Sequence, residues 1–173
     1  MLIPIEIVND NYVIRNICLE DLEKALDCIN QSEENCKILG NEEYISYNYI
    51  MERYLETLTN SLEFFCGVFI DEKLIGIIKG RIENNMQKEI WIMSFIIMEE
   101  YRNKGLGTNI LKSFEDYFLK SYYIKIFCAI VFDDNISGIS FWVKNGYIKS
   151  RIIKGMVTNN KNIIIYKKDV EQK

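Results

Sequence analysis

Histidine is absent from the 173-residue sequence, and its absence excludes several kinds of site at once. Without an imidazole, the chain has no Ser-His-Asp triad, no histidine-based metal site and no histidine general base. Any acid–base chemistry must therefore come from Asp, Glu, Tyr, Lys or Cys side chains, a terminal amine or water.

Cysteine is present, but not in the patterns that build structural sites. The five cysteines are odd in number, widely spaced and without a C-x-x-C pair, so we expect no disulfide framework, no zinc and no other metal. Reduced thiols of this kind are typical of a cytosolic protein. Cys66 and Cys128 lie inside apolar runs, and we interpret both as buried, inert thiols rather than nucleophiles.

Long apolar runs, an excess of basic charge and linker-like segments are also missing. No apolar run is long enough to span a bilayer, and no basic segment followed by an apolar core opens the chain, so we expect a cytoplasmic protein with no membrane partner. The net charge of −4 argues against a nucleic-acid partner. One proline and no repeat or low-complexity tract favour a single domain over residues 1–173.

Hydrophobic periodicity predicts a strand and two helices in the first third of the chain. Residues 11–17 are expected to form the strand, and apolar residues recur at helical spacing in the following "LEDLEKALDCIN". After "QSEENCKILG", a second helix is expected to begin near Asn41 as its N-cap. Its apolar face is predicted to consist of Tyr44, Tyr47, Met51, Tyr54 and Leu58.

The rest of the chain alternates between strands and helices. "EFFCGVFI" and "KLIGIIKGRIE" are expected to form a hairpin turning at Asp71–Glu72, and "ENNMQ" to lead into a buried strand, "EIWIMSFIIM". A helix over 107–122, a strand "YIKIFCAIVF", a short helix "NISGISFWVKNG" ending at Gly146, and a hairpin of "YIKSRIIKG" with "NIIIYKKD" follow. The order β-αα-βββ-α-β-α-ββ predicts a mixed α/β (α+β) fold, with helices flanking a mixed sheet.

The segment "RNKGLG", residues 102–107, lies between the buried strand and a helix. The first amide groups of a helix lack intrahelical acceptors and lie at the positive end of its dipole. Gly105 and Gly107 remove the side chains that keep a phosphate away, and Arg102 and Lys104 add positive charge, so the segment suits a diphosphate. On its own such a short motif is more often only a tight turn bearing solvated cations, and its context decides.

That context resembles the GNAT superfamily of N-acetyltransferases. "RNKGLG" matches the family's acetyl-CoA signature, [QR]-x-x-G-x-[GA], and "NISGISFWVKNGY" is similar to its second common segment. The resemblance is clear over residues 73–147, and the order of elements extends it along the chain. It implies a central, mostly antiparallel twisted sheet and acetyl-CoA as co-substrate. It also allows a homodimer, since members of the family often form dimers.

The resemblance also implies a role for each matching residue. Backbone amides of Arg102, Asn103, Lys104, Gly105, Leu106, Gly107 and Thr108 would hold the CoA pyrophosphate. The backbone of Phe95, Ile96 and Ile97 would pair with the pantetheine arm like a further strand, next to a bulge that frees an amide for the thioester carbonyl. Asn135 would bond to pantetheine and Lys144 to the adenosine phosphates. Alternatively, Asn135 is only an N-cap and Lys144 a solvated charge.

The sequence indicates the proton-transfer groups less clearly than the CoA-binding residues. Many family members place a tyrosine beside the CoA sulfur, but the resemblance places Trp142 there, and an indole N–H is not a useful acid. Candidates for the base that deprotonates the amine are Glu83, Glu89 and Ser94, near the central strand. Each is also compatible with an ordinary strand-end charge or surface hydroxyl.

We therefore expect an acyltransferase that moves an acetyl group from acetyl-CoA directly to a primary amine of a small molecule or protein. The alternative is a non-catalytic acyl-CoA-binding sensor of the same fold, which Trp142 keeps open. The acidic "SEEN" and "NEEY" segments are compatible with a cationic acceptor, and equally with helix caps and solvated faces.

Overall fold

A computed structural model describes residues 3–84, 86–155 and 161–170. Its strands form one eight-stranded sheet in the order β1-β2-β3-β4-β5-β6-β8-β7, in which β5 and β6 run parallel and the other described neighbours antiparallel. The strands are β1 (Glu6–Val8), β2 (Val13–Asn16), β3 (Glu63–Ile70), β4 (Lys73–Asn84), β5 (Lys88–Ile97), β6 (Ile126–Phe132), β7 (Ile148–Ile153) and β8 (Ile163–Asp169). This is the mixed, mostly antiparallel sheet that the sequence predicts.

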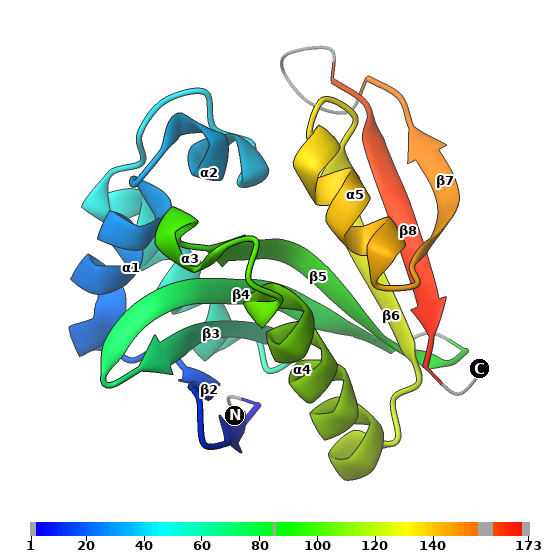
Figure 1. The fold of residues 1–173 in the computed structure, drawn as a ribbon, viewed down its shortest axis with the longest axis horizontal. Helices are drawn as coiled ribbons and strands as arrows, with labels where there is room; N and C mark the ends of the chain where they lie inside the picture. The colour runs from blue at the N-terminus through cyan, green and yellow to red at the C-terminus, as the bar shows by residue number, and fades with distance from the viewer. Residues whose placement is uncertain (1–2, 85, 156–160, 171–173) are drawn as a thin grey trace.

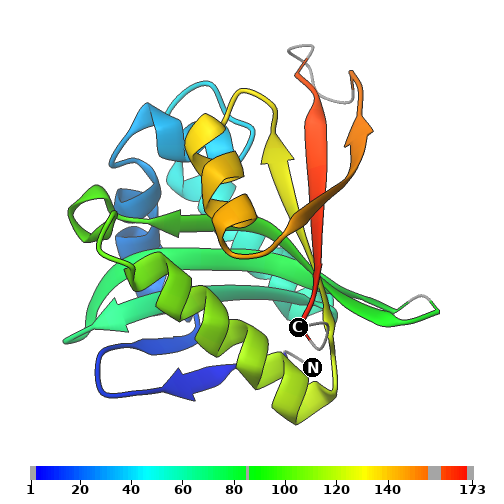
Figure 2. The ribbon, with the colours of Figure 1, turned by 45° about the vertical axis from the view of Figure 1, so that its right-hand side comes forward.

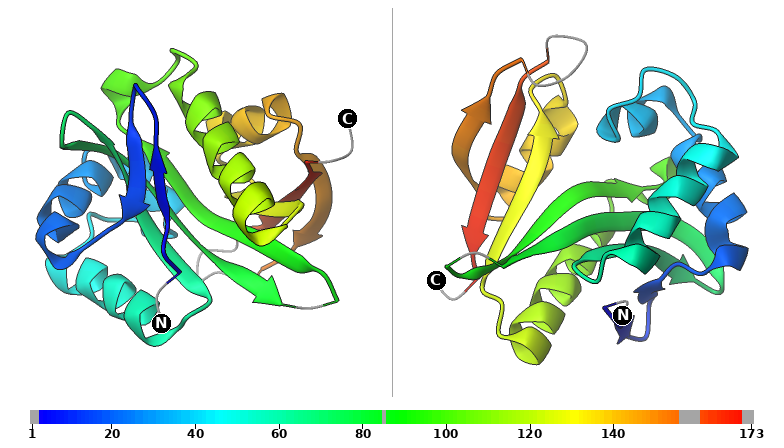
Figure 3. Two further views of the ribbon diagram at one scale, coloured as in Figure 1. Left: turned by 90° about the horizontal axis from the view of Figure 1, so that it is seen from below. Right: turned by 180° about the vertical axis from the view of Figure 1, so that it is seen from behind.

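Helices cover both faces of the sheet. They are α1 (Leu22–Ile29), α2 (Glu33–Ile38), α3 (Tyr47–Thr59), α4 (Leu106–Tyr122) and α5 (Ile136–Lys144), with short 3-10 turns η1 (Leu19–Asp21) and η2 (Glu99–Tyr101). Figures 1 and 3 show α4 and α5 on one face, and α1 and α3 on the other. One buried cluster joins α4 and α5 to the sheet and a second joins α1 and α3, so each helical layer has its own core.

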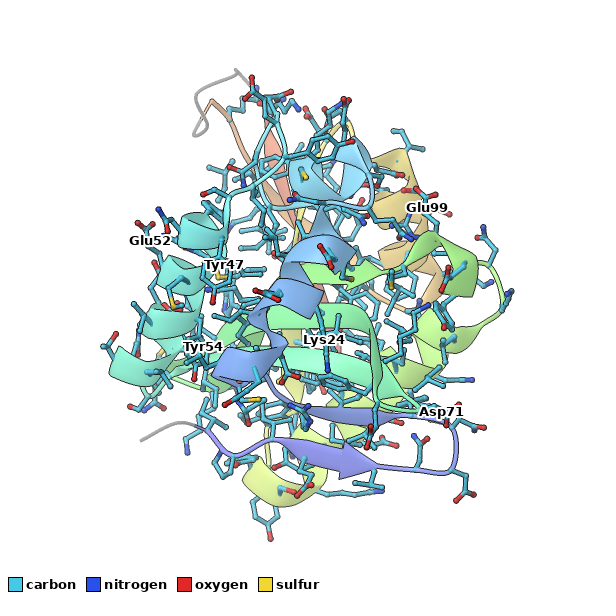
Figure 4. All side chains as sticks on the ribbon, turned by 90° about the vertical axis from the view of Figure 1, so that its left-hand side faces the viewer. Lys24, Tyr47, Glu52, Tyr54, Asp71 and Glu99 are labelled. Carbon is cyan, nitrogen blue, oxygen red and sulfur yellow. The ribbon has the colours of Figure 1, made fainter. Side chains whose placement is uncertain are left out.

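The long central strands follow directly from local sequence. Asp71 and Glu72 both have positive φ, 47° and 65°, and link β3 to β4 as the two-residue turn that suits twisted antiparallel strands. Figure 4 shows Asp71 at this turn. The expected hairpin is confirmed. The turn expected at "ENNMQ" includes residue 85, which lies outside the described residues.

Strands β5 and β6 begin as neighbours and then separate (Figure 1). Their parallel ladder runs from the Glu89–Ile126 pair to the Ile92–Ala129 pair and ends there. Beyond this point β5 continues toward α4, whereas β6 stays paired with β8. A wedge therefore opens inside the sheet, with one edge of β5 left unpaired along its last five residues.

A β-bulge lies where the wedge begins. Lys79 of β4 pairs with Ser94 of β5, and the next residue, Gly80, pairs with Ile92. Met93 therefore has no cross-strand partner, which bends β5 and increases its local twist. The bulge that the family resemblance implies is present.

Two expectations for the first third of the chain were wrong. "QSEENCKILG" contains a short helix, α2, and α3 begins at Tyr47 rather than near Asn41. Ser46, not Asn41, caps α3, because its Oγ accepts the Tyr49 amide at 3.2 Å. The expected strand over residues 11–17 is confirmed as β2, which pairs with β1, a strand that the sequence patterns did not predict.

The predicted apolar face of α3 is also wrong in part, because the helix begins later than expected. Its buried residues are Ile50 and Thr57, seven positions apart, whereas Tyr44 precedes the helix and is exposed. Tyr47 and Leu58 are also exposed, and Met51 and Tyr54 pack at the edge of the core. Figure 4 shows Tyr47, Glu52 and Tyr54 along α3, beside α1.

The later elements agree with the predictions. Helix α4 begins at Leu106, one residue before the expected start, and Gly146 follows α5 with a positive φ of 85°. The β8–β7 hairpin forms the outer end of the sheet (Figure 2). No helix in the described part of the chain is long and apolar enough to cross a membrane.

Candidate functional site

The wedge between β5 and β6 contains a cavity of about 620 Å³. Its lining residues come from the separated strand ends, the loop after β5, α2 and α5; Figure 1 shows where these elements lie. The lining residues are Glu34 and Ile38 of α2, residues 92–97 of β5, Arg102, Asn103, Gly105, Gly107 and Thr108, Ile130 and Val131 of β6, and Asn135, Ser137, Gly138, Ser140, Phe141, Trp142 and Lys144. Most of the residues predicted to bind CoA are thus brought together, and Lys104 and Leu106 are the two that do not line it.

The glycine loop presents free amides to this cavity. Gly105 precedes α4 with φ at 77°, and Asn103 is also left-handed at 59°. The first helical bond is donated by Asn109 to the Gly105 carbonyl, so the amides of residues 106–108 have no helical acceptor. A Cβ built on Gly105 meets nothing within 4 Å, so the space beside these donors is open. The loop therefore fits a phosphate group.

The cations of the loop are arranged differently from the expectation. Arg102 donates from Nε to the Ile97 carbonyl at 2.7 Å and from Nη2 to Asn35 Oδ1 at 2.5 Å, which ties the loop to α2. Lys104 Nζ donates to the Glu100 carbonyl at 2.7 Å, outside the cavity wall. Lys144 is exposed and lines the cavity, so its ammonium is available to an anion.

Asn135 serves as the N-cap of α5 and also lines the cavity. Its Oδ1 accepts the Gly138 amide at 2.8 Å and the Ser137 hydroxyl at 3.1 Å. A Cβ on Gly138 would lie 2.5 Å from Asn135 Nδ2, so the cap requires glycine there. The capping interpretation is confirmed, and a bond to pantetheine stays a prediction.

Three aromatic side chains hold α5 against β5 beside the cavity. Phe95 stacks on Phe141 with centroids 5.3 Å apart, and Trp142 meets Phe95 edge-on at 5.9 Å. A Cβ on Gly107 would lie 3.3 Å from the Phe141 ring, so this glycine lets α4 approach. No tyrosine lines the cavity in the described part of the chain, and the nearby Tyr147 donates instead to buried Glu115 at 2.8 Å.

The positions of the three candidate bases distinguish them from one another. Ser94 lies in the cavity wall and is only 6% exposed, and within the described residues its hydroxyl has no hydrogen-bond partner. Glu83 pairs with Arg81 at 2.6 Å, and Glu89 accepts Lys167 Nζ at 2.6 Å. Glu83 and Glu89 are cross-strand partners on the side of the bulge away from the unpaired strand edge, and both lie outside the cavity wall. Their position gives a base at Glu83 or Glu89 no support.

The cysteines in the sheet are buried, as expected. Burial is the main cause that raises the pKa of the Cys128 thiol to about 12, and the carboxylate of Glu89 adds to it. Burial also raises the pKa of Cys66 well above its usual range. Neither thiol carries appreciable thiolate near neutral pH, which disfavours a covalent acyl-cysteine.

The sequence patterns did not predict that α2 forms a wall of the cavity. Glu34 and Ile38 line it, and Ser137 of α5 bonds to Glu34 across the opening. The one local signal was Ser32 followed by two glutamates, since Ser32 Oγ caps α2 by accepting the Asn35 amide at 3.3 Å. A helix of six residues is too short to show a hydrophobic period.

Comparison with known families assigns most of the chain. Residues 14–164 match the protein-family model described as "Acetyltransferase (GNAT) domain". The chain belongs to the GNAT acetyltransferase family. The bulged and separated strands, the glycine loop and α5 of this GNAT domain all lie inside the matched segment.

Two relatives of this GNAT domain are named N-acetyltransferases. The spermine/spermidine N(1)-acetyltransferase of Bacillus subtilis is 26% identical over 84 residues, which cover 49% of this chain and 55% of that protein. The N-alpha-acetyltransferase of Saccharolobus solfataricus is 23% identical over 159 residues, covering 84% and 85%. The chain thus spans about half of the Bacillus relative that it matches.

A solved structure shares the fold of this GNAT domain along its length. The spermidine N-acetyltransferase of Vibrio cholerae, determined in complex with CoA and spermine, superposes with a TM-score of 0.77. The match covers 95% of this chain and 98% of that one at 16% identity, so the likeness is one of fold.

Proposed function

We propose that the chain is an acetyl-CoA-dependent N-acetyltransferase that acetylates a primary amine. The observation that carries the proposal is the cavity in the β5–β6 wedge, where the free amides before Asn109 and an unpaired strand edge meet. A diphosphate and an extended, amide-bearing arm are the ligand groups that suit these two features. CoA carries both, and the family membership agrees.

Each wall of the cavity has a part in holding this co-substrate. The amides of residues 106–108 would take the pyrophosphate, and Lys144 a terminal phosphate. The free edge of β5 from Ser94 to Ile97 would pair with the pantetheine arm. When bound, acetyl-CoA supplies a thioester carbonyl for an amine to attack, and a backbone amide at the Met93 bulge would serve as the oxyanion donor.

A sensor without transfer chemistry is the second candidate. It is favoured by one observation, that Trp142 replaces the tyrosine hydroxyl expected beside the sulfur and no tyrosine lines the cavity in the described residues. Transfer does not require such an acid, since a thiolate is a good leaving group that water can protonate later. We therefore keep the enzyme as the principal proposal.

The experiment is a thiol-release assay combined with calorimetry. The protein is titrated with CoA and then incubated with acetyl-CoA and 1,4-diaminobutane, spermidine or a short peptide with a free α-amino group. Amine-dependent release of free CoA, with mass spectrometry detecting the acetylated amine, is the expected result. CoA binding without release on a broad amine panel would favour the sensor, and absence of CoA binding would contradict both candidates.

A further inference from the structure

Strand β7 (Ile148–Ile153) forms one edge of the sheet, and no described strand pairs with it on its outer side. The sheet order ends in β6-β8-β7, and Figure 3 shows β7 outside β8. Among the described residues, only β8 bonds to the backbone of residues 148–153. Alternate residues of an edge strand direct their N–H and C=O groups away from the sheet, so β7 offers a row of free backbone groups.

The side chains of β7 are as accessible as its outer backbone groups. All but Ile153 are exposed, and the exposed fractions of Ile148 and Ile152 reach 75% and 44%. The register against β8 assigns Ile148 and Arg151 to one face of the sheet. Lys149 and Ile152 lie on the other face. Each face of the edge therefore combines exposed apolar surface with positive charge.

The end of the chain that contains β7 is basic, although the protein as a whole is acidic. Residues 144–168 contain seven lysines and arginines and no aspartate or glutamate, whereas the whole chain has 21 basic residues against 25 acidic ones. Cations on and before β8 pair with carboxylates of other elements: Lys161 with Asp134, Lys167 with Glu89 and Lys168 with Glu115. These inner charges are thus neutralised within the fold.

The cations of β7 and of the residue that follows it have no such partner. Lys149, Arg151 and Lys154 are exposed, and none of them forms an ion pair with another described residue. The Arg151 guanidinium lies 6.0 Å from the centre of the Trp91 ring, a contact that leaves its charge uncompensated. Unpaired positive charge along a short strand edge attracts an acidic partner.

We propose that β7 is the docking edge for an extended, acidic segment of another protein, which joins the sheet as a further strand beside β7. Backbone hydrogen bonds supply the affinity in this mode of recognition, and the exposed side chains select the partner. Acidic residues of the segment meet Lys149 and Arg151 on the two faces of the sheet. Its apolar residues cover Ile148 and Ile152.

The same charges argue against a second copy of this chain as the occupant. Pairing of two β7 strands would bring Lys149 and Arg151 of both copies into one short ladder, where like charges repel. RNA and anionic lipid would use the positive charge, but neither adds a strand to a sheet. An acidic polypeptide uses both the charge and the free strand edge.

The docking edge is separate from the CoA cavity. Strands β6 and β8 separate β7 from the wedge, and no residue of β7 lines the cavity. Docking at β7 is therefore independent of CoA binding and of acetyl transfer, and it adds a protein partner to the proposed function.

The probe is a capped, fluorescein-labelled octapeptide with two glutamates followed by two valines, repeated once. In an extended peptide this order gives both faces an acidic and an apolar group. One comparison peptide has glutamine in place of every glutamate. Another has every valine N-methylated, which keeps the charge but blocks strand pairing on both edges of the peptide. Binding to the whole chain is measured by fluorescence anisotropy, with and without CoA.

We expect Lys149→Gln combined with Arg151→Gln to weaken binding of the acidic peptide about tenfold, through the loss of two surface ion pairs. Lys24→Gln combined with Lys112→Gln is the matched control, because it removes the same charge from exposed positions on α1 and α4. The control should bind the peptide as the unsubstituted chain does. The glutamine and N-methylated peptides should bind about tenfold more weakly or less, and CoA should not compete.

Absence of binding of the acidic peptide, equal binding of the N-methylated peptide, or the same loss in the control variant would overturn the proposal. Tighter binding of single-stranded RNA or of phosphatidylglycerol vesicles, abolished by the β7 substitutions, would also overturn it, because the charge would then serve another class of partner. Self-association that sedimentation detects and that the same substitutions abolish would identify a second copy as the occupant instead. Each measurement is one of binding, so a failure of acetyl transfer would leave its outcome unaffected.

Discussion

Arg102 and Asn35 are joined by a hydrogen bond of 2.5 Å, although 67 positions separate them in the chain. Arg102 belongs to the proposed phosphate loop, and Asn35 to the helix that carries Glu34. The bond therefore connects the proposed phosphate loop to the α2 wall of the cavity. The arginine of the glycine motif acts here as a structural connection between the two halves of the site.

Asn35→Leu should destabilise the fold and weaken CoA binding. The leucine fills the space but removes the Asn35 partner of Arg102 Nη2 and of the Cys28 carbonyl. We expect a loss of about 2–3 kcal/mol in the free energy of unfolding, measured with urea, and a weaker affinity for CoA, measured by calorimetry. Asn41→Leu is the control, since its side chain makes one long bond of 3.5 Å to the Leu39 carbonyl. Equal effects in both variants would contradict the connection.

Gly105→Val should weaken CoA binding by tenfold or more without unfolding the domain. The new side chain would enter the open space beside the amides of residues 106–108. Gly155→Val is a matched control, because Gly155 also has positive φ, 64° against 77°, and also has no neighbour within 4 Å. Both variants bear a similar backbone strain, so calorimetry with CoA separates the effect of strain from loss of the phosphate-binding space. Undiminished CoA affinity in Gly105→Val would place the phosphate elsewhere.

Asp21 should make the fold sensitive to acid. Burial opposes its charge, but hydrogen bonds from Arg15, at 2.6 Å, and from Cys18 outweigh burial and lower the pKa from 3.8 to about 2. Because the folded-state pKa is depressed, this stabilisation is present above about pH 4 and is lost as pH falls toward 2. The contribution is about 2 kcal/mol.

Asp21→Asn should therefore lose stability at pH 7 and show a flatter decline between pH 4 and 2, by urea unfolding at each pH. Asp27→Asn, on the exposed side of the same helix, provides the comparison. A decline in Asp21→Asn as steep as in the unsubstituted chain would assign the acid sensitivity to other carboxylates.

Trp142→Phe should reduce stability without altering the alkaline limb of the pH–rate profile. The indole packs against Phe95 and, at 4.8 Å, against Tyr147, so the smaller ring costs about 1–3 kcal/mol. An indole N–H does not titrate in this range, and its removal withdraws no acid. Trp91→Phe, outside the cavity wall, gives the background effect of the same replacement. A shifted alkaline limb confined to Trp142→Phe would show that the indole participates in proton transfer.

The sequence predicted the elements with a clear period better than those that depend on tertiary contacts. The strand ending at Ile97, the loop through Gly105 and the helix after it follow from local pattern, and they form the wall nearest the proposed phosphate site. Helix α2 has six residues and no resolvable period, so its place opposite them could not be predicted. Glu34 was consequently missed as a site residue.

Predictions made from residue type alone were also wrong about the surroundings of some side chains. Arg102 looked like a free cation beside the glycines, but its partner Asn35 lies far away in sequence. Glu89 lies on the central strand, yet the cavity begins only where the ladder ends at Ile92, and Lys167 of the last strand neutralises it first. Such partners come from packing between elements, which strand and helix patterns do not encode.

The unpaired half of β5 makes the sheet itself incomplete until something occupies the wedge. A co-substrate that pairs with residues 94–97 would act as a ninth, exchangeable strand, and its binding energy would add to the folding free energy of the domain. At a ligand concentration 100 times its Kd, the gain is about 2.7 kcal/mol. The lifetime of the protein in a cell would then follow the supply of acetyl-CoA, so a shortage of the metabolite would lower the amount of the enzyme as well as its rate.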